Sequence, residues 1–367
     1  MHKANILMNV LNTILEKARG GEPLQEEDLL FLLQLEAKEE RQALFRAARE
    51  VRFKHFGNRV GLYGFVYFST YCRNDCAFCL YRKSNVSCER YRKTTEEIVA
   101  AAVALADSGV HLIDLTLGED PAYGAGHPTD FGPLIEIVRA VRERTCLPVM
   151  ISPGVVPKDV LVELQEAGAT WYACYQETHN RDLFADLRLQ QSYDERWSIK
   201  VFAKAIGMLV EEGLLVGVGD QVGDAVQSLL AMQELAADQV RAMTFVPQAG
   251  TPLAAWPQVG NGYELNLIAV MRLLFPECCI PASLDVEGIQ GLKDRLNAGA
   301  NVVTSIIPPA AGLQGVSQST LDIAEGFRTV AGVQPILADC GLQPATPAEY
   351  GQWLERLQHR TMLEEVL

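Results

Sequence analysis

The stretch VGLYGFVYFSTYCRNDCAFC, residues 60–79, joins an apolar run to a loop that carries three cysteines. The run at 60–68 predicts a buried β-strand, because it is apolar on both of its alternating faces. Cys72, Cys76 and Cys79 follow it directly, in C-x3-C-x2-C spacing. A closed tetrahedral metal site takes four protein ligands. Three cysteines therefore leave open what fills the fourth position.

Apolar runs of the same kind recur along the chain, each followed by an amphipathic stretch. We expect further strands at 111–117, 147–152, 170–176, 214–219, 240–246, 278–284 and 301–307. We expect helices from 94 (opened by TTEE, a capping-box pattern) and near 130–144, 157–167, 193–212, 223–236, 263–275 and 287–298. Eight β-then-α units predict an α/β fold, a (β/α)8 TIM-type barrel with its active site at the carboxyl ends of the strands. An open doubly wound sheet is the alternative.

The flanks of these units read as helices. We expect an N-terminal helical extension at 1–58, the barrel at 59–310, and a C-terminal helical tail at 311–367 that packs on the barrel. Polar residues follow each expected strand, among them GED at 118–120 and PQAGTP at 247–252. A ring of such loops at one rim is typical of a barrel active site.

Charge and composition exclude several classes of protein. The net charge is −14, from 32 basic and 46 acidic residues, and this argues against a nucleic-acid partner. No run approaches the ~20 apolar residues of a membrane span. The N-terminus lacks the features of a signal peptide, so we expect a cytoplasmic protein. The basic run at 81–93 is either a solvated loop or a source of positive charge beside a thiolate-bound cluster.

Nine cysteines, an odd and mostly isolated set, do not form the pattern of a secreted disulfide framework. Outside the triplet we expect buried, small apolar side chains. These are Cys88, Cys146, Cys174, Cys278, Cys279 and Cys340.

The cysteine triplet, with Phe78 before its last member, resembles the radical S-adenosylmethionine (SAM) superfamily. The resemblance implies that the three thiolates bind a [4Fe-4S] cluster, whose open iron takes the amino and carboxylate groups of SAM. It further implies five SAM contacts: Ser152 and Glu177, Arg188 on the SAM carboxylate, and Gly217 and Gly219 near the adenosine. The alternative is a structural zinc with His179 or Cys88 as its fourth ligand.

Three longer strings, LTLGEDP (115–121), RAMTFVPQAGTPL (241–253) and IPASLDVEGIQGLKDRLNAGANVVTSIIPP (280–309), narrow the resemblance. They are similar to the 3-methylornithine synthase (PylB) family of pyrrolysine biosynthesis, in the biotin synthase-like branch. That family implies a mutase in which a 5′-deoxyadenosyl radical abstracts a hydrogen from L-lysine. The carbon skeleton then rearranges to (3R)-3-methyl-D-ornithine. It also implies a reduced flavodoxin- or ferredoxin-type electron donor.

The same resemblance implies four substrate-binding residues, Asp114, Arg241, Ser283 and Asp285. The sequence assigns no catalytic residue beyond the cluster. An alternative is that Asp114 and Arg241 pair with each other inside the barrel, which would not exclude ligand contact. Another is an enzyme of the same branch with a different amino-acid-like substrate. A sulfur-inserting member would carry ligands for a second cluster, and no second cysteine motif is present.

Overall fold

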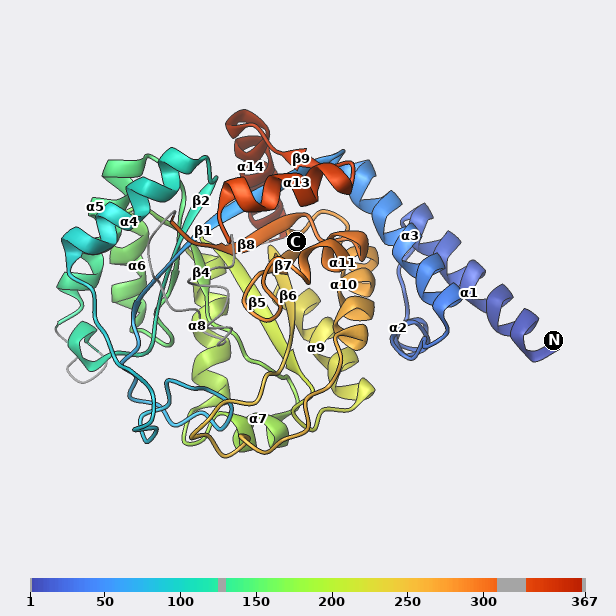
Figure 1. The fold of residues 1–367 in the computed structure, drawn as a ribbon, viewed down its shortest axis with the longest axis horizontal. Helices are drawn as coiled ribbons and strands as arrows, with labels where there is room; N and C mark the ends of the chain where they lie inside the picture. Colours follow the sequence, from blue (N-terminus) through green and yellow to red (C-terminus); the bar gives the residue numbers. More distant parts are fainter. Residues whose placement is uncertain (1, 125–129, 309–327, 365–367) are drawn as a thin grey trace.

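Eight parallel strands form the centre of this computed structural model, which describes residues 2–124, 130–308 and 328–364 (Figure 1). They are β1 (Arg59–Ser69), β2 (Leu112–Leu117), β3 (Val149–Ser152), β4 (Ala169–Ala173), β5 (Leu209–Val216), β6 (Gln239–Thr244), β7 (Pro281–Ser283) and β8 (Val302–Ile306). Their order is β6-β5-β4-β3-β2-β1-β8-β7. An isolated parallel bridge from Gln239 of β6 to Cys279, just before β7, links the two edges of the sheet. The sheet is therefore a nearly closed barrel, which confirms the predicted fold, and the open-sheet alternative is wrong.

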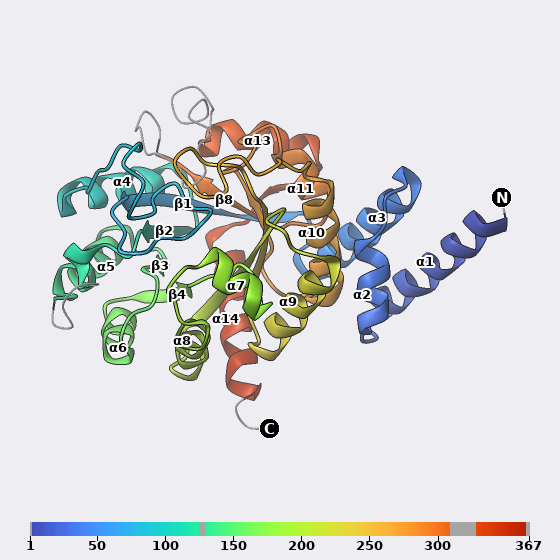
Figure 2. The ribbon, with the colours of Figure 1, turned by 90° about the horizontal axis from the view of Figure 1, so that it is seen from below.

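Helices surround the strands on the outside of the barrel (Figure 2). They are α4 (Thr95–Ser108), α5 (Gly132–Thr145), α6 (Lys158–Glu166), α8 (Tyr193–Ala205), α9 (Val222–Glu234), α10 (Gly262–Leu274) and α11 (Leu292–Asn297). A short 3-10 helix, η1 (Pro121–Tyr123), and a short α-helix, α7 (Arg181–Leu187), lie in the loops. The predicted capping box opens α4. The Thr94 hydroxyl accepts from the Glu97 backbone N–H at 3.3 Å, and the Glu97 carboxylate accepts from the Thr94 N–H at 2.7 Å.

The fifth unit differs most from its prediction. The helix expected at 193–212 ends at Ala205, and the strand expected at 214–219 begins at Leu209. The sequence LVEEGLLV lies in β5 with all eight residues buried, including Glu211 and Glu212. Two adjacent glutamates do not suggest a buried strand. They are accommodated because Arg241 pairs with Glu211 and Lys200 pairs with Glu212.

The N-terminal region forms three helices, α1 (His2–Gly20), α2 (Glu26–Leu33) and α3 (Lys38–Phe56). Of these, α2 and α3 pack against α10 of the barrel. Leu29, Leu32 and Leu44 are buried there, and α1 extends away from the barrel (Figure 1).

After α13 (Val330–Asp339), β9 (Gln343–Pro344) pairs with the start of β1. The last helix, α14 (Pro347–Glu364), closes the amino-terminal end of the barrel, where its Trp353 packs on Phe56 in an edge contact at 4.9 Å. The division into domains at 58 and 310 stays a prediction, and residues 309–327 lie outside the described part of the chain.

The six remaining cysteines differ in burial. Cys174, Cys278 and Cys279 are buried as expected, whereas Cys88 and Cys340 are half-buried. The expectation is wrong for Cys146, which is exposed; it lies at the C-cap of α5 with φ 55°. Within the described ranges, no helix has both the length and the apolar character that crossing a membrane requires.

Candidate active site

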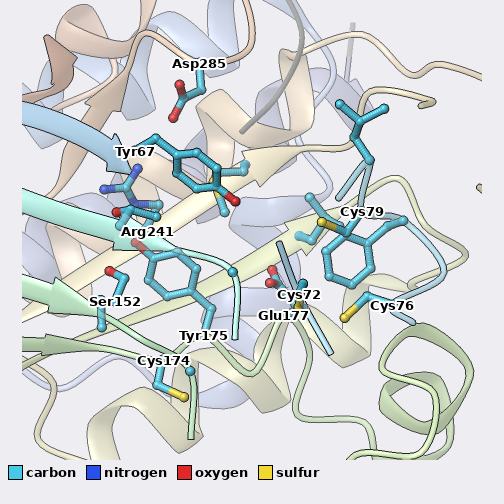
Figure 3. A pocket seen from close by; sticks show the side chains of 18 of the residues that line it. Tyr67, Cys72, Cys76, Cys79, Ser152, Cys174, Tyr175, Glu177, Arg241 and Asp285 are labelled. Carbon is cyan, nitrogen blue, oxygen red and sulfur yellow. The ribbon is translucent and has the colours of Figure 1, made fainter. Parts of the chain in front are cut away.

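One cavity lies at the carboxyl ends of the barrel strands (Figure 3). Nine of the twelve predicted site residues line it: Cys72, Cys76, Cys79, Asp114, Ser152, Glu177, Arg188, Arg241 and Asp285. Figure 3 shows the three cysteines and Glu177 toward one end, with Arg241 and Asp285 toward the other. The cavity therefore has a sulfur-rich end and a charged end, and each calls for a different ligand chemistry.

The loop that carries the cysteines is held by its backbone. The Ala77 N–H donates to the Leu187 carbonyl at 2.7 Å, and the Leu253 N–H donates to the Ala77 carbonyl at 3.3 Å. A Cβ atom at Gly118 would lie 2.2 Å from the Tyr71 carbonyl oxygen. Only glycine lets the loop after β2 approach the cysteine loop this closely. Segments after three strands thus fix the position of the triplet.

Arg90, from the basic run at 81–93, holds the same loop. Its guanidinium donates to the carbonyl oxygens of Tyr81 (2.9 Å), Arg82 (2.6 Å) and Asn85 (3.1 Å), and also to that of Thr70. A guanidinium can satisfy several carbonyls at once because its five N–H donors form a rigid, planar group. Arg90 is therefore part of the loop's structure and not a solvated side chain.

The cysteine sulfurs accept several hydrogen bonds. Gln191 Nε2 lies 3.0 Å from Cys76 Sγ, Arg188 Nη1 lies 3.8 Å from the same sulfur, and the Asn74 N–H lies 3.4 Å from Cys72 Sγ. Burial raises the pKa of Cys72 and of Cys79, and the neighbouring sulfurs raise that of Cys79 further. A bound cationic centre would reverse this, because metal binding displaces the thiol proton. The donor set fits a thiolate-ligated iron–sulfur cluster.

Neither residue expected as a fourth zinc ligand, His179 or Cys88, lines the cavity. His179 is buried beside Glu212, with Nε2 3.8 Å from the carboxylate, and does not line the cavity. The Cys88 thiol donates to the Leu80 and Asn85 carbonyls at 3.5 and 3.7 Å. Among the described residues, no three His, Cys, Asp or Glu side chains are grouped as ligands of a single ion. A four-iron cluster presents separate irons to its cysteines, so it does not need that grouping.

Glu177 and Arg188 lie beside the triplet as a buried pair, with Nη2 2.6 Å from Oε1. Glu177 has φ 68°, a left-handed conformation that is strained for a residue with a side chain. Its backbone is fixed by β5, since its N–H donates to the Gly213 carbonyl at 3.2 Å. Glu177 Oε2 and Arg188 Nε are buried without a hydrogen-bond partner. One free acceptor and one free donor suit the ammonium and carboxylate groups of an amino-acid moiety.

Of the other predicted SAM contacts, one lines the cavity and two do not. Ser152 lines the cavity and pairs in register with Thr116 of β2. Gly217 and Gly219 are not among the lining residues, but both have positive φ, 84° and 104°. The Asp220 carboxylate accepts from the Gly217 N–H at 2.7 Å and so stabilises the turn. The glycines therefore shape the loop after β5, behind the cavity wall.

At the charged end, Arg241 does not pair with Asp114 as the alternative had it. Its partner is Glu211, with Nε 2.7 Å from Oε1, and Tyr175 donates to the other Glu211 oxygen at 2.7 Å. Asp114 accepts from the Thr116 hydroxyl at 2.9 Å. Arg241 lies in the middle of β6, yet it lines the cavity. The cavity is therefore deep enough for a residue near the start of the strand expected at 240–246 to take part in the site.

Asp285 lies in a separate polar group. Its Oδ2 accepts from Ser305 at 2.6 Å and from Ser283 at 3.4 Å, and its Oδ1 accepts from Arg328 at 2.7 Å. Ser283 is buried behind Asp285 and does not line the cavity. Ser305 has φ 66°, so it is a second strained residue at the cavity wall. The family resemblance had implied Ser283 and Asp285, whereas Ser305 and Arg328 were not among the expected site residues.

Comparisons with known proteins agree with this geometry. The model of the radical SAM superfamily matches residues 66–224. The 3-methylornithine synthase of Methanosarcina acetivorans is 46% identical over 335 residues, which cover 91% of this chain and 94% of that protein. A crystal structure of methylornithine synthase (PylB) has a TM-score of 0.88 and 45% identity, covering 93% of this chain and 99% of the other. The hydrogenase maturase subunit HydE of Thermotoga maritima is 33% identical, covering 71% and 74%.

Proposed function

Because this chain belongs to the radical SAM superfamily and to its 3-methylornithine synthase family, we propose that it converts L-lysine into (3R)-3-methyl-D-ornithine. The observation that carries the proposal is the two-ended cavity, with thiols at one end and paired charges at the other. As a member of the superfamily, the enzyme uses a [4Fe-4S] cluster and SAM. When bound, these groups supply the radical that removes a hydrogen atom from the substrate.

We assign the cofactor contacts to the sulfur-rich end. Cys72, Cys76 and Cys79 would hold the cluster, and Glu177 and Arg188 would bind the amino-acid moiety of SAM through their free Oε2 and Nε. Ser152 would add a polar contact, and the turn at Gly217 and Gly219 would lie near the adenosine. Binding deep in this cavity would keep the substrate radical away from bulk water, which would quench it.

The charges at the other end support lysine as the substrate. Asp114, Glu211 and Asp285 bring three carboxylates, and Arg241 and Arg328 bring two guanidiniums. When all are ionised, these described groups sum to −1. L-Lysine has two ammonium groups and one carboxylate, so its charge is +1 at neutral pH. We assign Arg241 to the substrate carboxylate and Asp114 and Asp285 to the ammonium groups, with Ser283 orienting Asp285.

An enzyme of the same branch with another substrate is the second candidate. A substrate with a single ammonium group would leave one carboxylate at the charged end of the cavity without a partner. This disfavours such a substrate. A one-electron donor of the flavodoxin or ferredoxin type, and a cytoplasmic location, remain parts of the proposal.

The proposal is tested by anaerobic reconstitution with iron and sulfide, followed by SAM, a reductant and isotope-labelled L-lysine. Methylornithine is an isomer of lysine, so the products are derivatised and separated by chromatography before mass detection. A labelled product with the mass of lysine and a different retention time is the expected result. 5′-Deoxyadenosine without that product would refute lysine as the substrate while keeping the radical chemistry.

The apparent KM for lysine is expected to fall as the pH rises from 6 to 7 and then to level off. Burial raises the pKa of Asp114 to about 7, and the nearby Glu211 carboxylate also raises it, whereas Thr116 and Arg241 act in the opposite direction. Only the ionised carboxylate attracts an ammonium, so KM should change about tenfold per pH unit well below this pKa. Initial rates between pH 6 and 8.5 measure the profile.

Asp114→Asn is the control for this profile, because an amide does not ionise. Its KM should be high at every pH and independent of pH. A pKa raised from 3.8 to about 7 means that stability is lost as the pH rises through this window. At pH 8 the free energy of unfolding of Asp114→Asn should therefore exceed that of wild type by up to about 4 kcal/mol. A flat KM profile in the wild type would refute the role of Asp114.

A further inference from the structure

Arg328 comes from outside the barrel strands and reaches the cavity wall. It precedes α13 and its residue is fully buried. Its Nη2 donates to Asp285 Oδ1 at 2.7 Å and to the Ser305 carbonyl at 3.0 Å, and its Nε donates to the same carbonyl at 3.2 Å. Its own carbonyl accepts from the Ile307 N–H at 2.8 Å. The backbone and the side chain of Arg328 are thus both fixed to the end of β8.

These contacts determine how Asp285 faces the cavity. Ser305 binds the second carboxylate oxygen at 2.6 Å while its own carbonyl accepts from Arg328. Ser305 makes both contacts with its backbone in the left-handed region, at φ 66°. The cost of that conformation is consistent with a function of the group beyond stability. Asp285 itself lines the cavity, and Arg328 lies behind it.

Charge shows why a cation is needed behind Asp285. Without Arg328, the described groups at this end would be three carboxylates, Asp114, Glu211 and Asp285, against the single guanidinium of Arg241. Carboxylates that share a buried site without enough positive charge repel one another. Arg328 supplies the second positive charge of this end, directly behind the carboxylate that faces the cavity.

We propose that Arg328 is a positioning residue for the substrate: it holds the Asp285 carboxylate in a fixed orientation as an acceptor for one ammonium group of the amino-acid substrate. The inference rests on the proposed function for the identity of the ligand, L-lysine. It assigns a part of the substrate site to the C-terminal region that follows the barrel. Arg328 acts through Asp285 and does not touch the reacting atoms.

The test compares Arg328→Met and Arg328→Lys in the reconstituted holoenzyme. Methionine keeps much of the side-chain length and removes the charge, whereas lysine keeps the charge and loses the forked geometry. We expect Arg328→Met to raise the KM and the Kd for lysine about 10- to 100-fold, as for a lost charged hydrogen bond. Arg328→Lys should recover part of this loss. The kcat, the iron content and SAM cleavage without lysine should stay close to wild type.

Two controls separate positioning from folding. Arg139→Met removes an exposed cation of α5, which pairs with Glu136, and should leave every measurement unchanged. In an Asp285→Asn background, Arg328→Met should add little to the loss, since both act on one carboxylate. A wild-type KM in Arg328→Met would overturn the inference. So would a loss of stability and kcat with no change in KM, because that outcome indicates a purely structural ion pair.

Direct binding keeps this inference distinct from the proposed function. Lysine binding is measured by calorimetry on the oxidised holoenzyme with SAM, where no turnover occurs. If wild type binds lysine and yields no methylornithine, the proposed function fails, and the Kd of the Arg328 variants still tests the inference. If wild type does not bind lysine, both are overturned.

Discussion

Cys76→Ala is expected to abolish product formation and to leave the protein with far fewer than the roughly four irons per chain of a [4Fe-4S] cluster. Cys76 is the most buried of the three cysteines and accepts from Gln191 at 3.0 Å. Two thiolates cannot replace three, because one iron would then lose its only protein ligand. Loss of a group that hydrogen-bonds to a metal ligand already lowers metal affinity or activity about 10- to 100-fold, so the loss of a ligand itself should have a larger effect. Iron analysis, the visible spectrum and 5′-deoxyadenosine formation measure the effect.

Cys88→Ala is the matched control, since it removes a thiol from the same loop. Cys88 donates to two loop carbonyls and does not line the cavity. We expect this variant to keep its iron and its activity. Full turnover by Cys76→Ala would refute the cluster assignment. Loss of iron in Cys88→Ala would instead make Cys88 a ligand and revive a four-cysteine site.

The barrel could be predicted because its strands differ from its helices in a regular way. β1 is buried along almost its whole length and reads as an apolar run, and the helix after it carries its capping box in the sequence. The predicted bounds of the fifth unit were wrong because Glu211 and Glu212 are polar and adjacent, and yet both are buried in a strand. In a strand, neighbouring side chains point to opposite faces. Glu211 accordingly points to Arg241 inside the barrel, and Glu212 points to Lys200 on α8.

The site was predictable where a local motif or a family string carries it. The cysteine triplet and Glu177 are of this kind. Arg328 and Glu211 were missed because their partners are distant in the sequence: Arg328 is 43 residues from Asp285, and Glu211 is 30 residues from Arg241. No periodicity joins such residues. The register of β5 on β6, with Gly213 opposite Arg241, was needed to bring the second pair together.

Arg241→Met is expected to lower the free energy of unfolding by about 3–5 kcal/mol and to abolish lysine binding. Its guanidinium pairs with the fully buried Glu211 at 2.7 Å and also donates to the Thr304 hydroxyl at 3.3 Å. Removing one partner of a buried pair leaves the other charge without compensation. Asp114 lies near the same group, so its carboxylate also loses stabilisation when Arg241 is absent. Chemical denaturation of the protein and calorimetry with lysine measure the two effects.

The double variant Arg241→Met/Glu211→Leu separates these two roles. Replacing a whole buried ion pair with apolar side chains is often neutral for stability, so most of the lost free energy of unfolding should return. Lysine binding should not return, because no guanidinium then remains on β6 to take the substrate carboxylate. Recovery of both properties would show that Arg241 serves only to neutralise Glu211. Recovery of neither would mean that Tyr175, whose hydroxyl donates to Glu211 at 2.7 Å, cannot tolerate the loss of its acceptor.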